Sequence, residues 1–230
     1  KGDRVVADGV ERSLGDVTDL STSLVSSTDP FEDGSLVAKY EMENNVLDTV
    51  GVNNGTATNV TYGTGKFGQG ANFTASTSYI DTGFKPSISD FSVSLWVKPN
   101  SVSATYGYCS TITNSGTDRQ GFHMYQSGSI IGTSIYTAAG GVALDSAIAP
   151  STSTYTHVVF AYGGGGGRLY INGTQATTNS GVITAHFGDI HIGSYYASIP
   201  ASSSMGGSID QFEVFNRALT QTEVNILRTQ

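Results

Sequence analysis

Oxygen-bearing side chains follow one another closely at the end of the first predicted strand, which covers residues 35–42, and just after it. They are Glu41, Glu43, Asn44, Asn45 and Asp48. The turn at residues 51–55 comes directly afterwards, and its carbonyl groups add further oxygens. Because Ca²⁺ takes about six to eight oxygen ligands from carboxylates, amides and carbonyls, this cluster predicts a structural calcium site. The alternative is a solvated turn whose side chains hydrogen-bond to the local backbone.

Two of these acids also raise the question of catalysis. A strand would place the carboxylates of Glu41 and Glu43 on one face. Glycoside hydrolysis needs two carboxylates about 5–5.5 Å apart for retention or about 6.5–9.5 Å apart for inversion. No third acid follows at a matching spacing, so we predict no catalytic residues and a protein that is not an enzyme.

The remaining reactive side chains predict structural roles. The 4 histidines include no close pair and have no cysteine partner that would complete a zinc set. The single cysteine, Cys109, excludes an intramolecular disulfide and is expected to be a buried thiol.

Tyrosines offer a different chemistry, because aromatic rings can stack on the faces of sugars. The candidates are Tyr106, Tyr108, Tyr125, Tyr136, Tyr195 and Tyr196. Tyrosines are also frequent in ordinary strands, so the sequence assigns none of the six to a ligand-binding site.

Composition excludes several classes of function. The net charge is −8, and only 11 Lys and Arg residues are scattered along the chain, which excludes a nucleic-acid partner. No apolar run approaches the ~20 residues that span a bilayer, so we predict no membrane insertion. The 29 glycines, the low charged fraction of 13% and the many Ser, Thr, Tyr and Val residues favour strands and turns.

The elements that must position these residues are short strands separated by turns. Two β-patterned runs, at residues 156–162 and 168–171, flank five glycines and predict a hairpin. The run Phe91–Lys98 alternates strictly, and it places Trp96 on the face opposite the apolar residues, where a covering layer is expected. Near the end, the same rule places Asp210 beside Phe212 and Val214. A capping box at Thr220 predicts one late helix.

Residues 1–34 differ from the rest and are expected to form an extension before a domain at residues 35–230. The segment is acidic and rich in Ser and Thr, and its aliphatic residues are Val10, Leu14, Val17, Leu20 and Leu24. These spacings would place one apolar stripe on a helix that oligomerises or attaches the protein. A partly extended linker is the alternative, because Gly15 and the Ser cluster at residues 21–27 disfavour a helix.

Seven segments in order resemble a LamG-like jelly-roll domain of the concanavalin A-like lectin/glucanase superfamily. They are Leu36–Glu43, Gly65–Phe73, Phe91–Pro99, Tyr155–Val159, Arg168–Gly173, Ile190–Gly193 and Gly206–Thr220. Tyr155 stands where the family usually has Trp, and the cysteine pair of true laminin G modules is absent. The resemblance implies an all-β, antiparallel jelly-roll β-sandwich.

The resemblance also implies a place for the calcium ion. Glu43 stands at the family's Asp or Asn position after the first strand, and Asp210 at the Asp of the late Gly-x-Ile-Asp motif. We therefore predict Ca²⁺ held by Glu43 and Asp210, with Asn45 and Asp48 nearby. The Glu-x-Asp-x-x-Glu signature of related glucanases is absent.

Three functions follow as hypotheses, since this fold carries many functions. The first is a non-catalytic extracellular recognition module, a lectin or adhesion domain that binds a glycan or a protein surface. The second is a structural component of a virion surface, such as a phage tail fibre, head fibre or capsid decoration protein, multimerised through residues 1–34. The third is a glucanase-type glycoside hydrolase.

Overall fold

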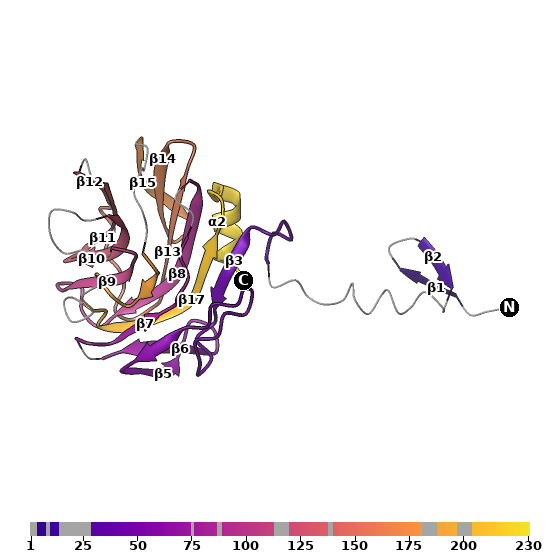
Figure 1. Cartoon of the computed structure of the whole chain (residues 1–230), viewed down its shortest axis with the longest axis horizontal. Helices are drawn as coiled ribbons and strands as arrows, with labels where there is room; N and C mark the ends of the chain where they lie inside the picture. Colours follow the sequence, from indigo (N-terminus) through magenta and orange to yellow (C-terminus); the bar gives the residue numbers. More distant parts are fainter. Residues whose placement is uncertain are drawn as a thin grey trace.

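The computed structural model describes residues 4–7, 10–13, 29–74, 76–86, 89–112, 120–137, 140–180, 188–196 and 204–230. From residue 29 onward, two antiparallel sheets pack face to face, and one short helix lies outside them (Figure 1). The predicted all-β jelly-roll sandwich is confirmed. Among the described residues, no helix is long and apolar enough to cross a bilayer.

The first sheet has seven strands in the order β12-β11-β10-β9-β16-β7-β4. Their bounds are β4 Thr56–Thr58, β7 Tyr79–Asp81, β9 Thr105–Ser110, β10 Gly121–Ser127, β11 Ile130–Thr137, β12 Gly140–Asp145 and β16 His191–Ile192. All the pairs between these strands are antiparallel.

The second sheet has eight strands: seven follow the order β15-β14-β13-β8-β17-β6-β5, and the eighth, β3, pairs with β17. Their bounds are β3 Leu36–Tyr40, β5 Val60–Thr64, β6 Gln69–Phe73, β8 Phe91–Pro99, β13 Thr156–Gly163, β14 Gly166–Ile171, β15 Thr174–Ser180 and β17 Gly207–Phe215. Strand β17 is central, because it pairs with β3, β6 and β8.

The described residues before residue 29 form a separate two-stranded sheet. Strands β1 Arg4–Ala7 and β2 Val10–Ser13 form an antiparallel hairpin. The predicted helix is therefore wrong at Val10–Ser13, where the chain forms a strand instead. The rest of the stripe, from Leu14 to Leu24, lies outside the described residues.

The core between the sheets is apolar, and β8 illustrates how its residues divide. Phe91, Val93, Leu95 and Val97 all belong to the core cluster and are fully buried. Trp96 points to the outer face, where it is 6% exposed. The expectation that a covering layer packs on that face is confirmed by the close rings of Phe67 and His157.

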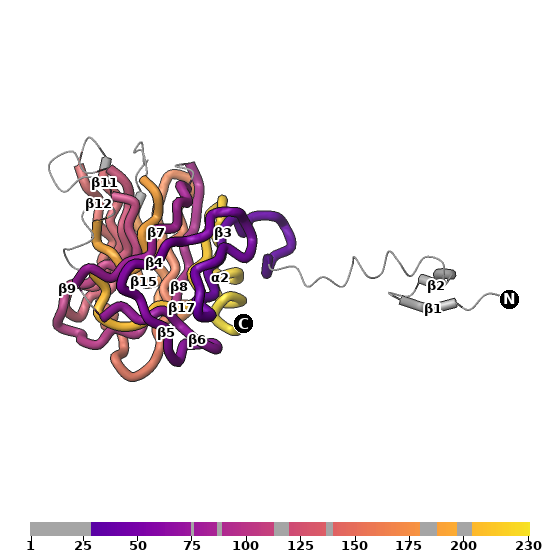
Figure 2. The backbone as a smooth tube through the Cα atoms, turned by 60° about the horizontal axis from the view of Figure 1, so that its bottom comes forward, coloured from indigo at the N-terminus to yellow at the C-terminus, as the bar shows by residue number. Residues whose placement is uncertain are grey.

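Helix α2, Gln221–Leu227, packs on the outer face of the eight-stranded sheet, next to β3 (Figure 2). Val224 and Leu227 bury themselves there in a second apolar cluster. The predicted capping box is confirmed, since the Thr220 hydroxyl accepts from the backbone N–H of Glu223, whose carboxylate accepts from the backbone N–H of Thr220. The predicted glycine hairpin is also confirmed, with β13 and β14 joined through Gly164 and Gly165 at positive φ.

The predicted alternation along β17 is wrong around Asp210. The register with β8 shifts between Asp210 and Glu213, and Gln211 has φ +47°. This β-bulge adds one residue to the strand, so Phe212 and Val214 enter the core while Asp210 pairs with the outward Trp96. Asp210 therefore does not share the apolar face on which strict alternation placed it.

Asp210 instead holds the loop between β5 and β6. Its Oδ2 accepts from the backbone N–H groups of Lys66 and Phe67, at 2.7 and 2.9 Å, and its Oδ1 accepts from that of Gln211 at 2.8 Å. Burial raises the pKa of Asp210 to about 6, although these N–H groups oppose the shift. The nearby Glu43 carboxylate raises this pKa further.

Loss of the cap at Thr220 should destabilise the domain. For Thr220→Ala we expect the free energy of unfolding to fall by about 1 kcal/mol, because an N-cap hydroxyl is lost. Urea unfolding measures it. Thr222→Ala, at an exposed position in the first turn, is the control and should change stability by less than about 0.5 kcal/mol. Equal effects of the two variants would contradict the capping role.

The raised pKa of Asp210 should make stability depend on pH. The folded pKa lies above the unfolded value of 3.8, so the stability that protonation of Asp210 contributes is lost as the pH rises from about 4 to about 6. We expect a loss of about 2 kcal/mol between pH 4.5 and pH 7, measured by urea unfolding at these two values. The Asp210→Asn variant should lack this part of the pH dependence. An identical pH dependence in both proteins would contradict the assignment.

Candidate functional site

Aromatic side chains gather on the outer face of the seven-stranded sheet. In β10, Phe122 and Met124 point into the core, so His123 and Tyr125 point outward. Tyr136 of β11 and the segment that follows β16 lie against them. We call Tyr125, Tyr136, Tyr195 and Tyr196, which gather around His123, the tyrosine cluster.

His123 is the centre of this cluster. Its ring centroid lies 4.6 Å from that of Tyr125, 5.6 Å from that of Tyr136 and 4.4 Å from that of Tyr195. Tyr195 contacts Tyr196 in turn, at 4.8 Å with the rings nearly perpendicular. His123 is fully buried under these rings, whereas Tyr136, Tyr195 and Tyr196 are half-buried. The tyrosine cluster thus exposes aromatic surface to solvent, and the buried His123 packs beneath it.

Glycines on the neighbouring strands leave room for the rings. A Cβ on Gly132 of β11 would lie 2.7 Å from the Tyr125 ring, and one on Gly141 of β12 would lie 2.6 Å from the Tyr136 ring. A Cβ on Gly107 of β9 would collide with the backbone of Tyr195. Each ring or segment therefore crosses a neighbouring strand at a position without a side chain.

Polar groups border the cluster on one side. The Tyr125 hydroxyl donates to Asp145 Oδ1, and Ser134 Oγ lies 3.4 Å from the same hydroxyl. Burial raises the pKa of Tyr125, and the bond to Asp145 raises it further, so the phenol stays protonated. The exposed Asp145 carboxylate remains an acceptor at the edge of the sheet.

The other two candidate tyrosines lie elsewhere. Tyr108 is fully buried in the core, where its hydroxyl lies 3.3 Å from Gln126 Oε1. Tyr106 lines an open cavity of about 280 Å³ together with Ser204 and Met205. Register explains the division, because a bulge in the β9–β10 pairing shifts the alternation of one strand against the other.

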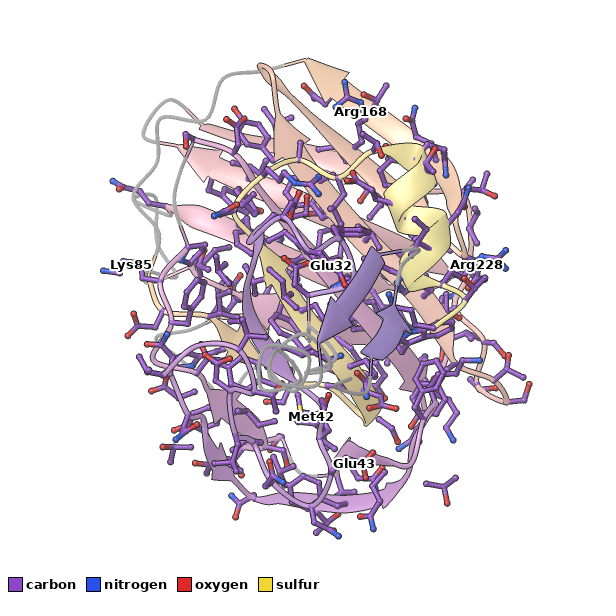
Figure 3. The ribbon with its side chains drawn as sticks, turned by 90° about the vertical axis from the view of Figure 1, so that its right-hand side faces the viewer. Glu32, Met42, Glu43, Lys85, Arg168 and Arg228 are labelled. Carbon is purple, nitrogen blue, oxygen red and sulfur yellow. The ribbon has the colours of Figure 1, made fainter. Side chains whose placement is uncertain are left out.

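The predicted metal residues are only partly brought together. Glu43 and Asp210 both contact the loop between β5 and β6: the two Glu43 carboxylate oxygens lie 3.1 and 3.2 Å from the backbone nitrogen of Gln69. Met42 and Glu43 lie side by side after β3 (Figure 3). Gly68, at φ +50°, leaves the space that the Glu43 carboxylate occupies.

Asp48 and Asn45 serve a different turn. The Asp48 Oδ1 accepts from the backbone N–H groups of Lys39, Val50 and Gly51, and its Oδ2 accepts from that of Asn53. Asn45 bonds to its own neighbours: its Nδ2 donates to the Glu43 carbonyl, and its Oδ1 accepts from the backbone N–H of Leu47. These contacts match the alternative interpretation of the oxygen-rich residues 41–48, in which their side chains hydrogen-bond to the backbone of a turn.

This donor set does not fit a cation at Asp210. N–H groups point at both of its oxygens, and such dipoles favour a negative charge at the same point. Within the described ranges, no group of three or more His, Cys, Asp or Glu side chains could hold a metal ion. Calcium binding stays a prediction from the family resemblance.

The pair Glu41 and Glu43 also separates. Glu41 lies 3.5 Å from Lys39 Nζ, whereas Glu43 turns to the loop between β5 and β6. Met42, at φ +61°, breaks the extended backbone between the two acids, so they do not continue a regular alternation. The sequence predicts a strand that continues to residue 42, but β3 ends at Tyr40.

Two histidines lie outside the tyrosine cluster, and both have the structural role that the sequence predicts. His157 is buried on the outer face of the eight-stranded sheet beside Trp96, where its Nε2 lies 3.0 Å from Ser94 Oγ, and burial lowers its pKa to about 3. His191 stacks on Tyr79 at 5.4 Å on the outer face of the seven-stranded sheet. No spacing in the sequence pointed to this pair, because β7 and β16 are far apart in the chain.

The opposite face of the molecule holds a smaller cavity of about 170 Å³. It is lined by Lys39, Phe67, Ser94, Trp96, Gln211, Glu213, Leu227 and Gln230. Lys39 Nζ lies 3.4 Å from the buried Glu213 carboxylate, so this charge has a partner. Lys66 covers the Trp96 ring at 4.6 Å, which leaves that ring little free surface for a ligand.

Solved structures with this fold include sugar-binding domains. Domain 4 of AbnA, a GH43 extracellular arabinanase from Geobacillus stearothermophilus, in complex with arabinotriose, is 22% identical, with a TM-score of 0.68 over 84% of this chain and 98% of that chain. The ligand binding domain of botulinum neurotoxin serotype D, in complex with N-acetylneuraminic acid, is 18% identical, with a TM-score of 0.67 over 85% of this chain and 50% of that chain.

These likenesses concern the fold, and the chain spans about half the length of the toxin structures it matches. No curated protein matches the chain. Residues 73–225, well over half of the chain, match the family model Laminin_G_3, described as the concanavalin A-like lectin/glucanases superfamily. The protein therefore belongs to the concanavalin A-like lectin/glucanases superfamily.

Proposed function

We propose that this protein is a non-catalytic carbohydrate-binding module that works outside the cell, and that the tyrosine cluster is its sugar-binding site. The observation that carries the proposal is the gathering of half-buried tyrosine rings around His123 on one open sheet face. Rings held in this way present aromatic faces to sugar C–H groups at little cost in side-chain entropy, since their neighbours already order them.

The polar groups beside the rings support the same function. Sugar hydroxyls need acceptors and donors next to the stacking surface, and Asp145, Ser134 and the Tyr125 hydroxyl offer them. The buried His123 ring lies beneath the tyrosine rings and supports them. The similar structures that hold arabinotriose and N-acetylneuraminic acid make a glycan ligand the natural expectation for this fold.

The absence of catalysis is part of the proposal. Glu41 and Glu43 go to different partners, and the tyrosine cluster has one bordering carboxylate, that of Asp145, among the contacts described above. Glycosidases need two carboxylates that flank one bond. A glucanase remains the third hypothesis, and incubation with β-glucans followed by detection of reducing ends tests it.

The role of residues 1–34 as an oligomerising or virion-attachment arm also stays a proposal. It predicts a stable trimer that is lost when the arm is deleted. Size-exclusion chromatography with light scattering on the full chain and on the chain from residue 35 measures this. A monomer in both cases would remove the motive for a virion surface protein.

Substitution of the cluster tyrosines should abolish most sugar binding. We expect Tyr136→Ala and Tyr196→Ala each to weaken binding about tenfold, because each removes one stacking face. Binding is measured by a glycan array and then by calorimetry with arabinotriose and the oligosaccharides that the array selects.

The matched control is Tyr155→Ala. This half-buried tyrosine lies beside Lys98 of the other sheet, and its hydroxyl bonds to Thr64. Its loss should leave sugar affinity unchanged, and circular dichroism checks that all three variants fold. No signal from the wild-type protein on the array, or equal losses from Tyr155→Ala and Tyr136→Ala, would contradict the proposed site.

Metal removal tests the calcium prediction separately. The hydrogen bonds at Asp210 and Glu43 account for the loop between β5 and β6 without a cation, so we expect the same thermal midpoint in EDTA and in millimolar CaCl₂. A lower midpoint in EDTA that Asp210→Asn removes would instead support the calcium site that the family resemblance implies.

A further inference from the structure

A continuous row of outward residues crosses all seven strands of the sheet that carries the tyrosine cluster. Direct cross-strand pairs join its members from β12 to β4. In order they are Ala143, Ser134, His123, Ser110, His191, Asp81 and Thr56. The row passes under the tyrosine cluster at His123 and continues beyond it through Ser110 to His191.

A second aromatic pair lies where the row reaches β16 and β7. Tyr79 stacks on His191, with ring centroids 5.4 Å apart and planes only 7° from parallel. Ile80 and Ile192 belong to the core, so Tyr79 and His191 share the outer face with the cluster. Tyr79 is half-buried, and Asp81 Oδ1 lies 3.5 Å from His191 Nε2.

The tyrosine cluster and the pair of Tyr79 and His191 lie further apart than the length of one sugar unit. Tyr136 is on β11 and Tyr79 on β7, four strands further along the sheet. At a spacing of about 4.8 Å between strands, the two tyrosines are about 19 Å apart across the sheet. The register also sets them four residues apart along the strands, which is about 13 Å, so they stand about 23 Å apart. One sugar unit of an extended chain is about as long as one strand spacing, so a chain of about four or five units would reach from one tyrosine to the other.

The charges on this face are negative. The strands of the seven-stranded sheet contain no Lys or Arg in their described residues, whereas Asp81 and Asp145 both lie on the outer face. Burial lowers the pKa of His191, which keeps its ring neutral at pH 7. Arg168 and Arg228 lie near α2, on the side of the other sheet, whereas the exposed Lys85 lies beyond the end of β7, outside the strands of this face (Figure 3). An anionic sugar would therefore be repelled here.

From this arrangement we propose that Tyr79 and His191 form a second sugar-contact place of the same site, and that the ligand is an uncharged oligosaccharide of about four or five units lying obliquely across the strands. The inference rests on the proposed function. It adds two residues, a direction for the chain and a class of glycan, and each can fail while sugar binding at the tyrosine cluster stands.

A series of chain lengths tests the second place. For neutral oligosaccharides of the type selected by the array, we expect the affinity to rise from two to about four or five units and then to level off. Tyr79→Ala should lower the affinity for the tetrasaccharide about tenfold, to that of the disaccharide, and leave the disaccharide unchanged. Tyr62→Ala, at a half-buried tyrosine of β5 on the other sheet, is the control.

The outcomes separate the two claims. Disaccharide binding that Tyr136→Ala weakens, together with a tetrasaccharide that Tyr79→Ala leaves unaffected, would overturn the second place but keep the proposed function. An absence of binding to every oligosaccharide would overturn both. A loss of disaccharide binding in Tyr79→Ala would also overturn the division into two places, and circular dichroism of this variant tells such a loss from misfolding.

A paired comparison tests the charge argument. A sialylated tetrasaccharide should bind at least about fivefold more weakly than its neutral parent at low salt, and the difference should shrink at high salt. Asp81→Asn keeps the shape of the side chain and should reduce the difference. Equal binding of the two glycans, or tighter binding of the sialylated one, would contradict an uncharged ligand.

Discussion

The structure depends on the packing of two antiparallel sheets on one apolar core, because that packing decides which residues of each strand point inward. Phe122 and Met124 fill the core from β10, so the residues between and after them, His123 and Tyr125, must face outward. Residues that bind a ligand can therefore stand at outward positions without weakening the core. Helix α2 covers part of the outer face of one sheet, whereas the tyrosine cluster lies on the outer face of the other.

On the outer face of the seven-stranded sheet, glycines leave room for the tyrosine rings. Gly107, Gly132 and Gly141 are outward positions at which a side chain would collide with the tyrosine rings or with the backbone that carries them. Their absence of a Cβ lets rings from neighbouring strands cross the sheet. Strands rich in glycine lose some intrinsic stability, and aromatic residues that cover such glycines compensate for it. The same contacts therefore order the rings that we assign to sugar binding.

Much of the fold could be predicted from the sequence, because local signals specify strands and turns. The glycine hairpin, the alternation in β8 and the capping box at Thr220 are such signals, and all three are confirmed. The face of Asp210 could not be predicted, since one bulged residue at Gln211 reverses the alternation that follows. The site was likewise hidden: cross-strand register, with its own bulge between β9 and β10, brings the cluster tyrosines together and separates Tyr106 and Tyr108 from them.

The most direct test of the central claim is to map where a sugar touches the protein. In a titration of the ¹⁵N-labelled protein with a neutral tetrasaccharide, followed by NMR, we expect the largest shifts at backbone amides of β7, β10, β11 and β16, around Tyr125, Tyr136 and His191. The side-chain resonance of Trp96, on the opposite sheet, should stay in place. Shifts that concentrate instead around Trp96 and the cavity beside Glu213 would contradict the assignment of sugar binding to the seven-stranded sheet.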